Sequence, residues 1–242
     1  MRQRLDQTLL ARQLVASRSQ AEDLINRGFV TVNDRVSTKP GMLVDASSQL
    51  KIKPHTSFVS RAGEKLFSVI KVLDVNFNNK VVLDVGSSTG GFTDLALRHG
   101  ATKVVAVDVG TNQLHPSLHS NPKIELHEKT DIRNFQTTES FDIVVVDVSF
   151  ISLREILPTV AKLSGPRTLI LAMVKPQFEA HADNLKHKGV IKNEHLRRDI
   201  FKKFEAWTQQ MFIIIAKADS KVAGTKGNIE RFYKLRKISA VH

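Results

Sequence analysis

A glycine-rich loop follows the first strongly apolar segment in the larger part of this sequence, within residues Leu83–Phe92. Glycine at the end of a buried strand lets a ligand approach the backbone closely, and the helix after it offers free N–H groups at its N-terminus. The loop therefore predicts nucleotide binding. A tight strand-to-helix turn that binds nothing is the alternative for this loop taken alone.

Carboxylates at the ends of the next two predicted strands narrow the kind of nucleotide. Asp108 ends the second strand, where a carboxylate can accept both hydroxyls of a ribose, and Asp131 follows the third. The loop lacks both the Gly-x-Gly-x-x-Gly and the Gly-x-x-x-x-Gly-Lys-[Ser/Thr] patterns, which disfavours a pyrophosphate ligand. A ligand with a ribose, an adenine and a cationic group, S-adenosylmethionine, suits these residues. Either aspartate could instead cap the turn after its strand.

The elements that must position these residues alternate between strand and helix from Lys80 onward. An amphipathic helix precedes them, starting at Arg61, with Lys65 beside its apolar stripe. Alternation of this kind predicts an α/β fold, a doubly wound parallel sheet covered on both faces. The expected strands are 80–85, 103–108, 124–127, 141–147, 167–174, 211–218 and 230–235, and the expected helices are 90–99, 152–163 and 196–209.

Residues 1–53 predict a separate small α+β domain, with two short helices followed by strands. We expect Ser19 to cap the second helix, Gly28 to end it, and Asn33 to allow a tight hairpin turn. Nine Lys and Arg against five Asp and Glu make the segment basic, which suits RNA binding but also an ordinary solvated surface. Residues 54–60 predict a linker, and residues 61–242 the larger domain.

Composition sets further limits. Lys and Arg number 36 against 24 Asp and Glu, which gives a net charge of +12 and indicates a polyanionic partner. Cysteine is absent, which excludes disulfides, thiolate nucleophiles and thiolate-bound metals. The longest apolar runs fall far short of the ~20 residues of a spanning helix, and no secretory signal is apparent, so we expect a cytoplasmic protein.

A pattern of residues near the N-terminus resembles the S-four RNA-binding module, named after ribosomal small-subunit protein four. The matching positions include Arg4-Leu5-Asp6, Leu9-Leu10, Ser17-Arg18, Ala21, Ile25, Gly28, Val30, Val32-Asn33 and Lys39-Pro40. The resemblance implies that structured RNA is gripped through the two-helix face. The candidate RNA-binding residues are Arg4, Arg12, Arg18 and Arg27.

Further motifs, in order along the chain, look like the TlyA family, also called haemolysin A. The motifs are 58–66, the 88–93 loop, 107–110, 147–153, 174–179 and 226–230. The resemblance implies an rRNA cytidine 2′-O-methyltransferase with a Rossmann-like catalytic domain similar to the FtsJ-type enzymes and S-adenosylmethionine as cofactor. The family points to the large-subunit rRNA, with a small-subunit site in longer members, and the short ends here favour the large subunit alone.

The same resemblance implies a catalytic tetrad of Lys65, Asp147, Lys175 and Glu230. A ribose hydroxyl is a weak acid, so methyl transfer to it needs in-line positioning and a group that takes up the proton. We expect Lys175 to act as base, Lys65 to orient the hydroxyl, and the two carboxylates to fix the ammonium groups. Read singly, each of the four is as readily part of a structural salt bridge. The implied cofactor residues are Gly86, Ser88, Gly90, Gly91, Phe92, Asp108 and Asp131.

Other functions remain open on the sequence alone. A catalytically inactive RNA-binding or ribosome-assembly adaptor would keep the small domain, although all four tetrad residues are present. The family name haemolysin suggests a membrane-active protein, but this function is disfavoured because the sequence has no amphipathic stretch of the kind that lyses membranes. Two basic segments, residues 186–203 and 217–237, hold seven Lys and Arg against two Asp and Glu each, and could guide an RNA backbone. We expect ribosomal RNA or a ribosomal subunit as partner, and the sequence indicates neither a metal nor an oligomer.

Overall fold

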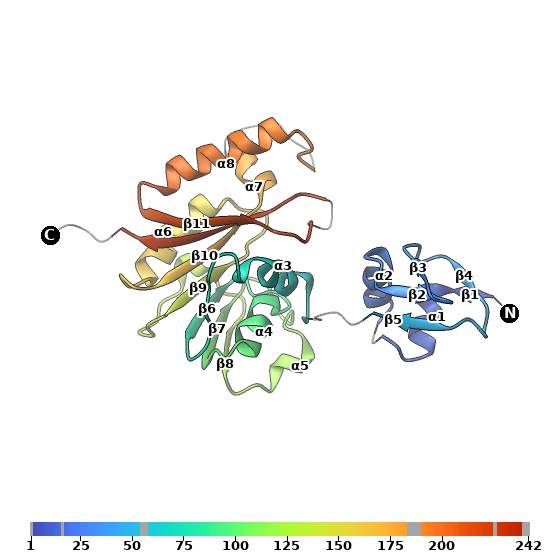
Figure 1. Ribbon diagram of the computed structural model, residues 1–242. Helices are drawn as coiled ribbons and strands as arrows, with labels where there is room; N and C mark the ends of the chain where they lie inside the picture. The colour runs from blue at the N-terminus through green and yellow to red at the C-terminus, as the bar shows by residue number, and fades with distance from the viewer. Residues whose placement is uncertain (1, 16, 54–57, 183–189, 225–226, 239–242) are drawn as a thin grey trace. The chain divides into compact units, whose positions relative to one another are not determined.

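The chain forms two compact units, Met1–Thr56 and Ser57–His242, called here the N-terminal and C-terminal units (Figure 1). The computed structural model describes residues 2–15, 17–53, 58–182, 190–224 and 227–238. The first four residues of the linker predicted at 54–60 lie outside this description.

The N-terminal unit packs two helices against short strands around a small apolar core. Its elements are β1 (Gln3–Arg4), α1 (Leu5–Ala11), α2 (Arg18–Asn26), β2 (Val30–Val32), β3 (Arg35–Ser37), β4 (Leu43–Val44) and β5 (Leu50–Ile52). β2 lies between β3 and β5 in an antiparallel sheet, and β1 pairs with β4. Leu5, Leu9 and Ile25 are fully buried between the helices and the sheet.

Three turn and cap residues of the N-terminal unit were predicted from the sequence: Asn33, Gly28 and Ser19. Asn33 and Asp34 both have positive φ, 49° and 62°, so the predicted tight hairpin turn is confirmed. Gly28 has a φ of 72° just after α2, as expected of the residue that ends a helix. The cap at Ser19 is wrong. α2 begins two residues earlier than that assignment allows, and the Ser17 hydroxyl accepts the hydrogen bond from the Gln20 amide at 3.2 Å.

The C-terminal unit is built on a seven-stranded sheet in the order β11-β12-β10-β9-β6-β7-β8. β6 to β10 are parallel to one another, whereas β12 runs antiparallel to β10 and to β11. The strands are β6 (Val81–Val85), β7 (Lys103–Val107), β8 (Ile124–His127), β9 (Ile143–Val146), β10 (Leu169–Val174), β11 (Phe212–Asp219) and β12 (Arg231–Lys237). The α/β class is confirmed. The all-parallel sheet is wrong at this edge, because segment 220–230 is shorter than the dozen or more residues of a parallel crossover.

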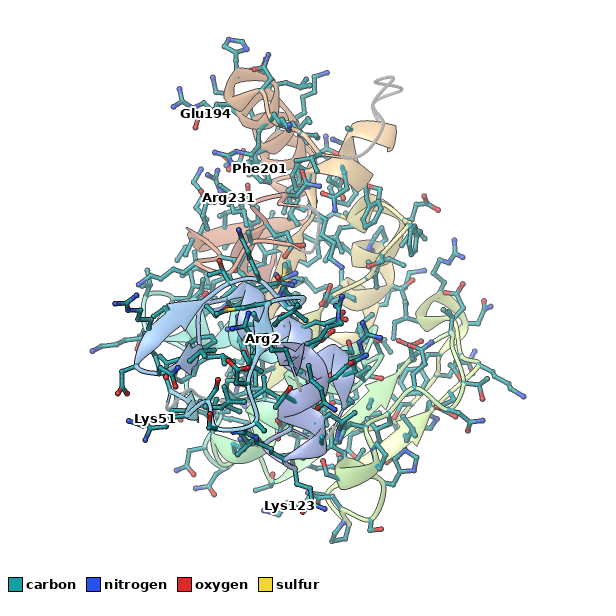
Figure 2. The ribbon with its side chains drawn as sticks, turned by 90° about the vertical axis from the view of Figure 1, so that its right-hand side faces the viewer. Arg2, Lys51, Lys123, Glu194, Phe201 and Arg231 are labelled. Carbon is teal, nitrogen blue, oxygen red and sulfur yellow. The ribbon has the colours of Figure 1, made fainter. Side chains whose placement is uncertain are left out.

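Helices cover both faces of this sheet. α3 and α4 pack on one face, while α6 and α8 pack on the other, as Figure 1 shows. Figure 2 labels Arg231 of β12 and Phe201 of α8, and the guanidinium lies 4.4 Å from the centre of that ring. The helices are α3 (Arg61–Ile70), α4 (Gly91–Arg98), α5 (Pro116–His119), α6 (Leu153–Leu163), α7 (Pro176–Ala182) and α8 (Glu194–Thr208), with a 3-10 turn at Ile132–Asn134. α5 and α7 are short and were not expected from the sequence.

Candidate active site

Two lysine–carboxylate pairs lie at the edge of the sheet where the parallel strands end. The Lys175 ammonium is 2.5 Å from Asp147 Oδ1, and the Lys65 ammonium is 2.6 Å from Glu230 Oε2. The exposed fraction of these side chains is 14% or less. Lys175 also donates a hydrogen bond of 2.7 Å to the Ser149 hydroxyl. Charges this deeply buried persist because each is paired.

Strand register explains why residues so distant in the chain meet here. Val174 of β10 pairs with Arg231 of β12, so the residues just beyond them, Lys175 and Glu230, leave neighbouring strands at the same edge. Asp147 follows β9, which is the other neighbour of β10. The sheet therefore supplies three of the four residues implied by the resemblance.

The fourth residue comes from α3, which is attached to the segment before Glu230. Arg61 donates a hydrogen bond of 2.6 Å to the carbonyl of Ala223, and the Lys221 amide donates one to the Ser68 hydroxyl at 3.2 Å. Lys65 lies between these two contacts on the helix. The pairing of Lys65 with Glu230 is thus supported by hydrogen bonds on both sides.

A small cavity of about 130 Å³ opens beside the Lys175–Asp147 pair. Three polar atoms on its wall are buried and have no hydrogen-bond partner among the described residues: Asp84 Oδ1, Ser87 Oγ and Ser60 Oγ. Burial raises the pKa of Asp84 to about 7, against the hydrogen bond that Thr93 donates to its other oxygen at 2.6 Å. A buried carboxylate with an open oxygen indicates a place for a cationic or hydrogen-bond-donating ligand.

A larger cavity of about 460 Å³ adjoins the first, since Gly86, Ser88, Asp147 and Ser149 line both. Asp108 lies on its wall and accepts hydrogen bonds from the amides of Ser88 and Gly110, at 2.8 and 2.6 Å. Much of the remaining wall is apolar, from Val107, Val109, Ile132, Val148 and Ile151. This combination of an apolar pocket and few polar groups is typical of a small-molecule site.

Asp131 also lines the larger cavity, but its carboxylate is engaged. Arg133 donates to both of its oxygens, at 2.6 Å to Oδ2, and lowers the pKa of Asp131. The Arg133 amide donates to the same carboxylate at 2.9 Å, so Asp131 caps the 3-10 turn that follows it. The capping alternative considered from the sequence is therefore present in the structure.

The glycines of the loop differ in what they contact. Gly86 lines both cavities with a φ of +80°, and a Cβ there would lie 2.5 Å from the Asp147 carbonyl oxygen. Gly90 and Gly91 do not line either cavity; they allow close packing against Leu118 and Ser60. Phe92 is buried and lines the small cavity.

The four arginines of the N-terminal unit proposed for RNA binding all contact their own unit. Arg4 and Arg18 pair with the buried Asp6, at 2.9 and 3.0 Å, and Arg27 pairs with Asp23. Arg12 donates to the carbonyls of Ser48 and Ala46. Arg4 and Arg18 remain about half exposed, which leaves part of each guanidinium for a ligand.

The two basic segments are only partly described. Residues 186–189, 225 and 226 lie outside the described residues. In the described part of segment 217–237, Lys217 pairs with Glu205 and Arg231 pairs with Asp219. Lys234 of the same segment donates hydrogen bonds to the carbonyls of Leu73 and Asp74. In the first segment, exposed cations lie on α8 and at the residue before its N-cap: Lys192, Arg198, Lys202 and Lys203.

Several residues of the site were not assigned roles from the sequence. Asp84 could have been found, because it is the one charge within the apolar strand Val81–Val85. The sequence gives Phe150 no role beyond its place in the motif at 147–153. Phe150 is 93% exposed with a φ of 67°, and its ring lies 5.4 Å from that of Phe178. A bulky residue in this left-handed conformation is strained, which is common at functional sites.

The fold and the site together define a class: a nucleotide-binding α/β enzyme domain joined to a small basic unit. Family models agree, since the FtsJ-like methyltransferase family matches residues 58–237 and the S4 domain matches residues 3–50. The chain belongs to the TlyA group of the FtsJ-like methyltransferase family.

Individual relatives support this membership. The 23S rRNA (cytidine-2′-O)-methyltransferase TlyA of Campylobacter jejuni is 40% identical over 73% of this chain and 70% of its own length. The 16S/23S rRNA (cytidine-2′-O)-methyltransferase TlyA of Mycobacterium tuberculosis is 34% identical over 97% and 90%. A solved structure described as a candidate hemolysin from Streptococcus thermophilus has 33% identity and a TM-score of 0.75, over 98% of this chain and 89% of that one.

Among the described residues, no helix has both the length and the apolar character needed to cross a membrane. Over the same ranges, no three His, Asp or Glu side chains gather where they could hold a metal ion.

Proposed function

We propose that this protein methylates the ribose 2′-hydroxyl of a cytidine in ribosomal RNA, with S-adenosylmethionine as methyl donor. The observation that carries the proposal is the Lys175–Asp147 pair, held at 2.5 Å where two adjoining cavities meet. The names of the relatives from Campylobacter jejuni and Mycobacterium tuberculosis support the reaction, and both names include the 23S rRNA. The large-subunit rRNA is therefore the proposed substrate.

The residues around the cavities fit this cofactor. The unpaired Asp84 oxygen and the hydroxyls of Ser60 and Ser87 suit the ammonium end of the methionine moiety. Asp108 suits the ribose hydroxyls, and the apolar wall with Asp131 suits the adenine. When bound, the cofactor supplies a methyl group activated by a sulfonium.

The tetrad positions the 2′-hydroxyl and takes up its proton. Lys175 Nζ takes the proton of the 2′-hydroxyl, which requires the neutral amine at that moment. Asp147 and Ser149 hold this nitrogen in place from the same loop. Lys65 donates to the hydroxyl oxygen and orients it, while Glu230 fixes the Lys65 chain. Positioning of this kind accounts for much of the rate of a transfer between two bound reactants.

The RNA is held by surfaces outside the cavities. Phe150, exposed next to the pocket wall, offers an aromatic face on which a nucleobase can stack. Residues 1–53 form the proposed RNA-binding domain, with Arg4, Arg12, Arg18 and Arg27 toward phosphates, and residues 61–242 form the methyltransferase domain, with 54–60 as linker. α8 contributes further positive charge.

The proposal is tested with purified protein, isotopically labelled S-adenosylmethionine, and separate samples of large subunits, small subunits and free rRNA. We expect labelled 2′-O-methylcytidine in the large-subunit rRNA, together with cofactor binding by calorimetry. Binding of RNA without cofactor binding or methyl transfer would instead establish the adaptor alternative and refute the enzyme.

A further inference from the structure

Glu179 is a buried acid outside the tetrad that touches both segments carrying Asp147 and Lys175. We propose that it is a positioning residue, which fixes the spacing of the Lys175–Asp147 pair by joining the start of α7 to the start of α6. This inference rests on the proposed function, because it assigns Glu179 a part in the same reaction.

The contacts of Glu179 are those of a clamp between two helices. Its side chain is 1% exposed, and its two oxygens accept hydrogen bonds from the Ser152 hydroxyl at 2.7 Å and the Leu153 amide at 2.8 Å. The Arg154 guanidinium lies 3.6 Å away. Ser152 is the N-cap of α6, and Leu153 its first residue, so the carboxylate occupies the end of an eleven-residue helix that favours negative charge.

The path of the chain links these contacts to the proposed base. Glu179 follows Lys175 by one helical turn, and its amide donates to the Lys175 carbonyl at 3.3 Å. Asp147 lies only five residues before Ser152, at the other end of a loop that also carries Ser149. Holding Ser152 and Leu153 against Glu179 therefore limits how far Asp147 and Ser149 can move from the Lys175 nitrogen.

The loop between Asp147 and Ser152 needs such a constraint. Phe150 is held in a left-handed conformation that costs free energy, so the loop would relax if nothing opposed it. A buried carboxylate is itself costly unless its oxygens are hydrogen-bonded, and both Glu179 oxygens are. A shift of the loop by as little as about 1 Å can lower the rate of a positioned reaction by roughly 100-fold.

Three variants test the inference, each assayed well below its own unfolding temperature. In Glu179→Ala the clamp is lost, and we expect kcat at saturating rRNA and cofactor to fall by about 100-fold, with KM values changed much less. Glu179→Gln can still accept from the Leu153 amide and can donate to the Ser152 hydroxyl, so it should recover most of kcat. Glu205→Ala is the control, because Glu205 accepts from the buried Tyr233 hydroxyl at 2.8 Å and holds α8 to the sheet instead.

A second readout does not depend on methyl transfer. Amide hydrogen exchange in residues 147–153 should accelerate in Glu179→Ala, but not in Glu179→Gln or Glu205→Ala. If Glu179→Ala does not fold, Ser152→Ala removes one of the two donors and should give a smaller loss of kcat with the same faster exchange.

The outcomes separate this inference from the proposed function. A wild-type protein that transfers no methyl group refutes the proposed function, and the exchange measurement then still decides whether Glu179 clamps the loop. An active Glu179→Ala variant, an equal loss in Glu179→Gln, unchanged exchange, or an equal loss in Glu205→Ala would each overturn the positioning role.

Discussion

Each unit of the protein buries an aspartate near the residues proposed to be functional, and the two aspartates are in opposite electrostatic states. Asp6 of the N-terminal unit is fully buried and pairs with Arg4 and Arg18, whose hydrogen bonds hold its pKa well below the usual range. Asp84 of the C-terminal unit is 1% exposed, and its burial, together with the nearby Asp147 carboxylate, raises its pKa to about 7.

The contrast between Asp6 and Asp84 distinguishes a buried charge that stabilises the fold from a buried acid that is available to a ligand. Asp6 organises the arginines of its own unit, so its charge is compensated within the chain. Asp84 has an oxygen open to a cavity, so its compensation must come from what binds there. The Lys175–Asp147 and Lys65–Glu230 pairs lie between these extremes, since each charge is paired within the chain and the first pair borders the cavities.

The largest expected effect comes from the pair that borders the cavities. Lys175→Ala removes the proposed base and should lower methyl transfer by at least ~1,000-fold. Cofactor affinity should stay within a few-fold of wild type, as measured by calorimetry. Lys217→Ala is the matched control, because Lys217 pairs with Glu205 away from the cavities. Near-normal turnover in Lys175→Ala would remove this residue from the role of base.

Replacing Asp84 by Asn should weaken cofactor binding and should stabilise the cofactor-free protein at high pH. Because the pKa of Asp84 is higher in the folded than in the unfolded chain, its contribution to stability is complete below about pH 4 and is lost as pH rises through about 7. Without cofactor, Asp84→Asn should therefore be more stable than wild type at pH 8, by at most about 4 kcal/mol. Its cofactor affinity should fall by about tenfold or more, because an ammonium loses a charged partner.

Denaturation at several pH values, with and without S-adenosylmethionine, measures both effects. Equal stability of Asp84→Asn and wild type from pH 4 to pH 8, together with unchanged cofactor affinity, would show that the Asp84 carboxylate does not bind the cofactor.

The compensated aspartate should behave in the opposite way. The lowered pKa of Asp6 means that its contribution is present above about pH 4 and is lost as pH falls below that value. Asp6→Asn should destabilise the N-terminal unit at pH 7 by about 2 kcal/mol, a modest figure because both arginines are half exposed. Hydrogen exchange resolved by residue should be faster than in wild type in α1 and α2, and unchanged in β6. Faster exchange in both units alike would contradict this assignment.

The smallest effect concerns the RNA contacts of the N-terminal unit. Arg12→Ala should weaken rRNA binding by about threefold at 0.1 M salt and reduce the slope of log affinity against log salt by about one. Arg12→Lys keeps the charge and should retain the slope. If both variants match wild type in slope, Arg12 serves only its contacts with the carbonyls of Ala46 and Ser48.

The sequence was sufficient for features that depend on local pattern. Apolar runs located the strands to within a few residues, and the glycine-rich loop after β6 located the turn into α4, because burial and turn conformation are encoded by neighbouring residues. Even the antiparallel β12 could have been predicted from the length of segment 220–230, since that segment is too short for a parallel crossover.

The contacts of the site could not be predicted in this way. Lys65 and Glu230 are 165 positions apart, and no periodicity in either segment indicates the other as partner. The tetrad came from a resemblance to known proteins. Glu179 shows the same limit, because its donors, Ser152 and Leu153, lie more than 25 positions away in the sequence and meet it only through the packing of two loops.

The most direct test of the proposed methyl transfer is a map of ribose methylation on ribosomal RNA from cells that contain the protein, lack it, or carry only Lys175→Ala. We expect a 2′-O-methylcytidine in the large-subunit rRNA that is present in the first sample and missing from the other two. Identical maps in all three samples would contradict the proposed transfer.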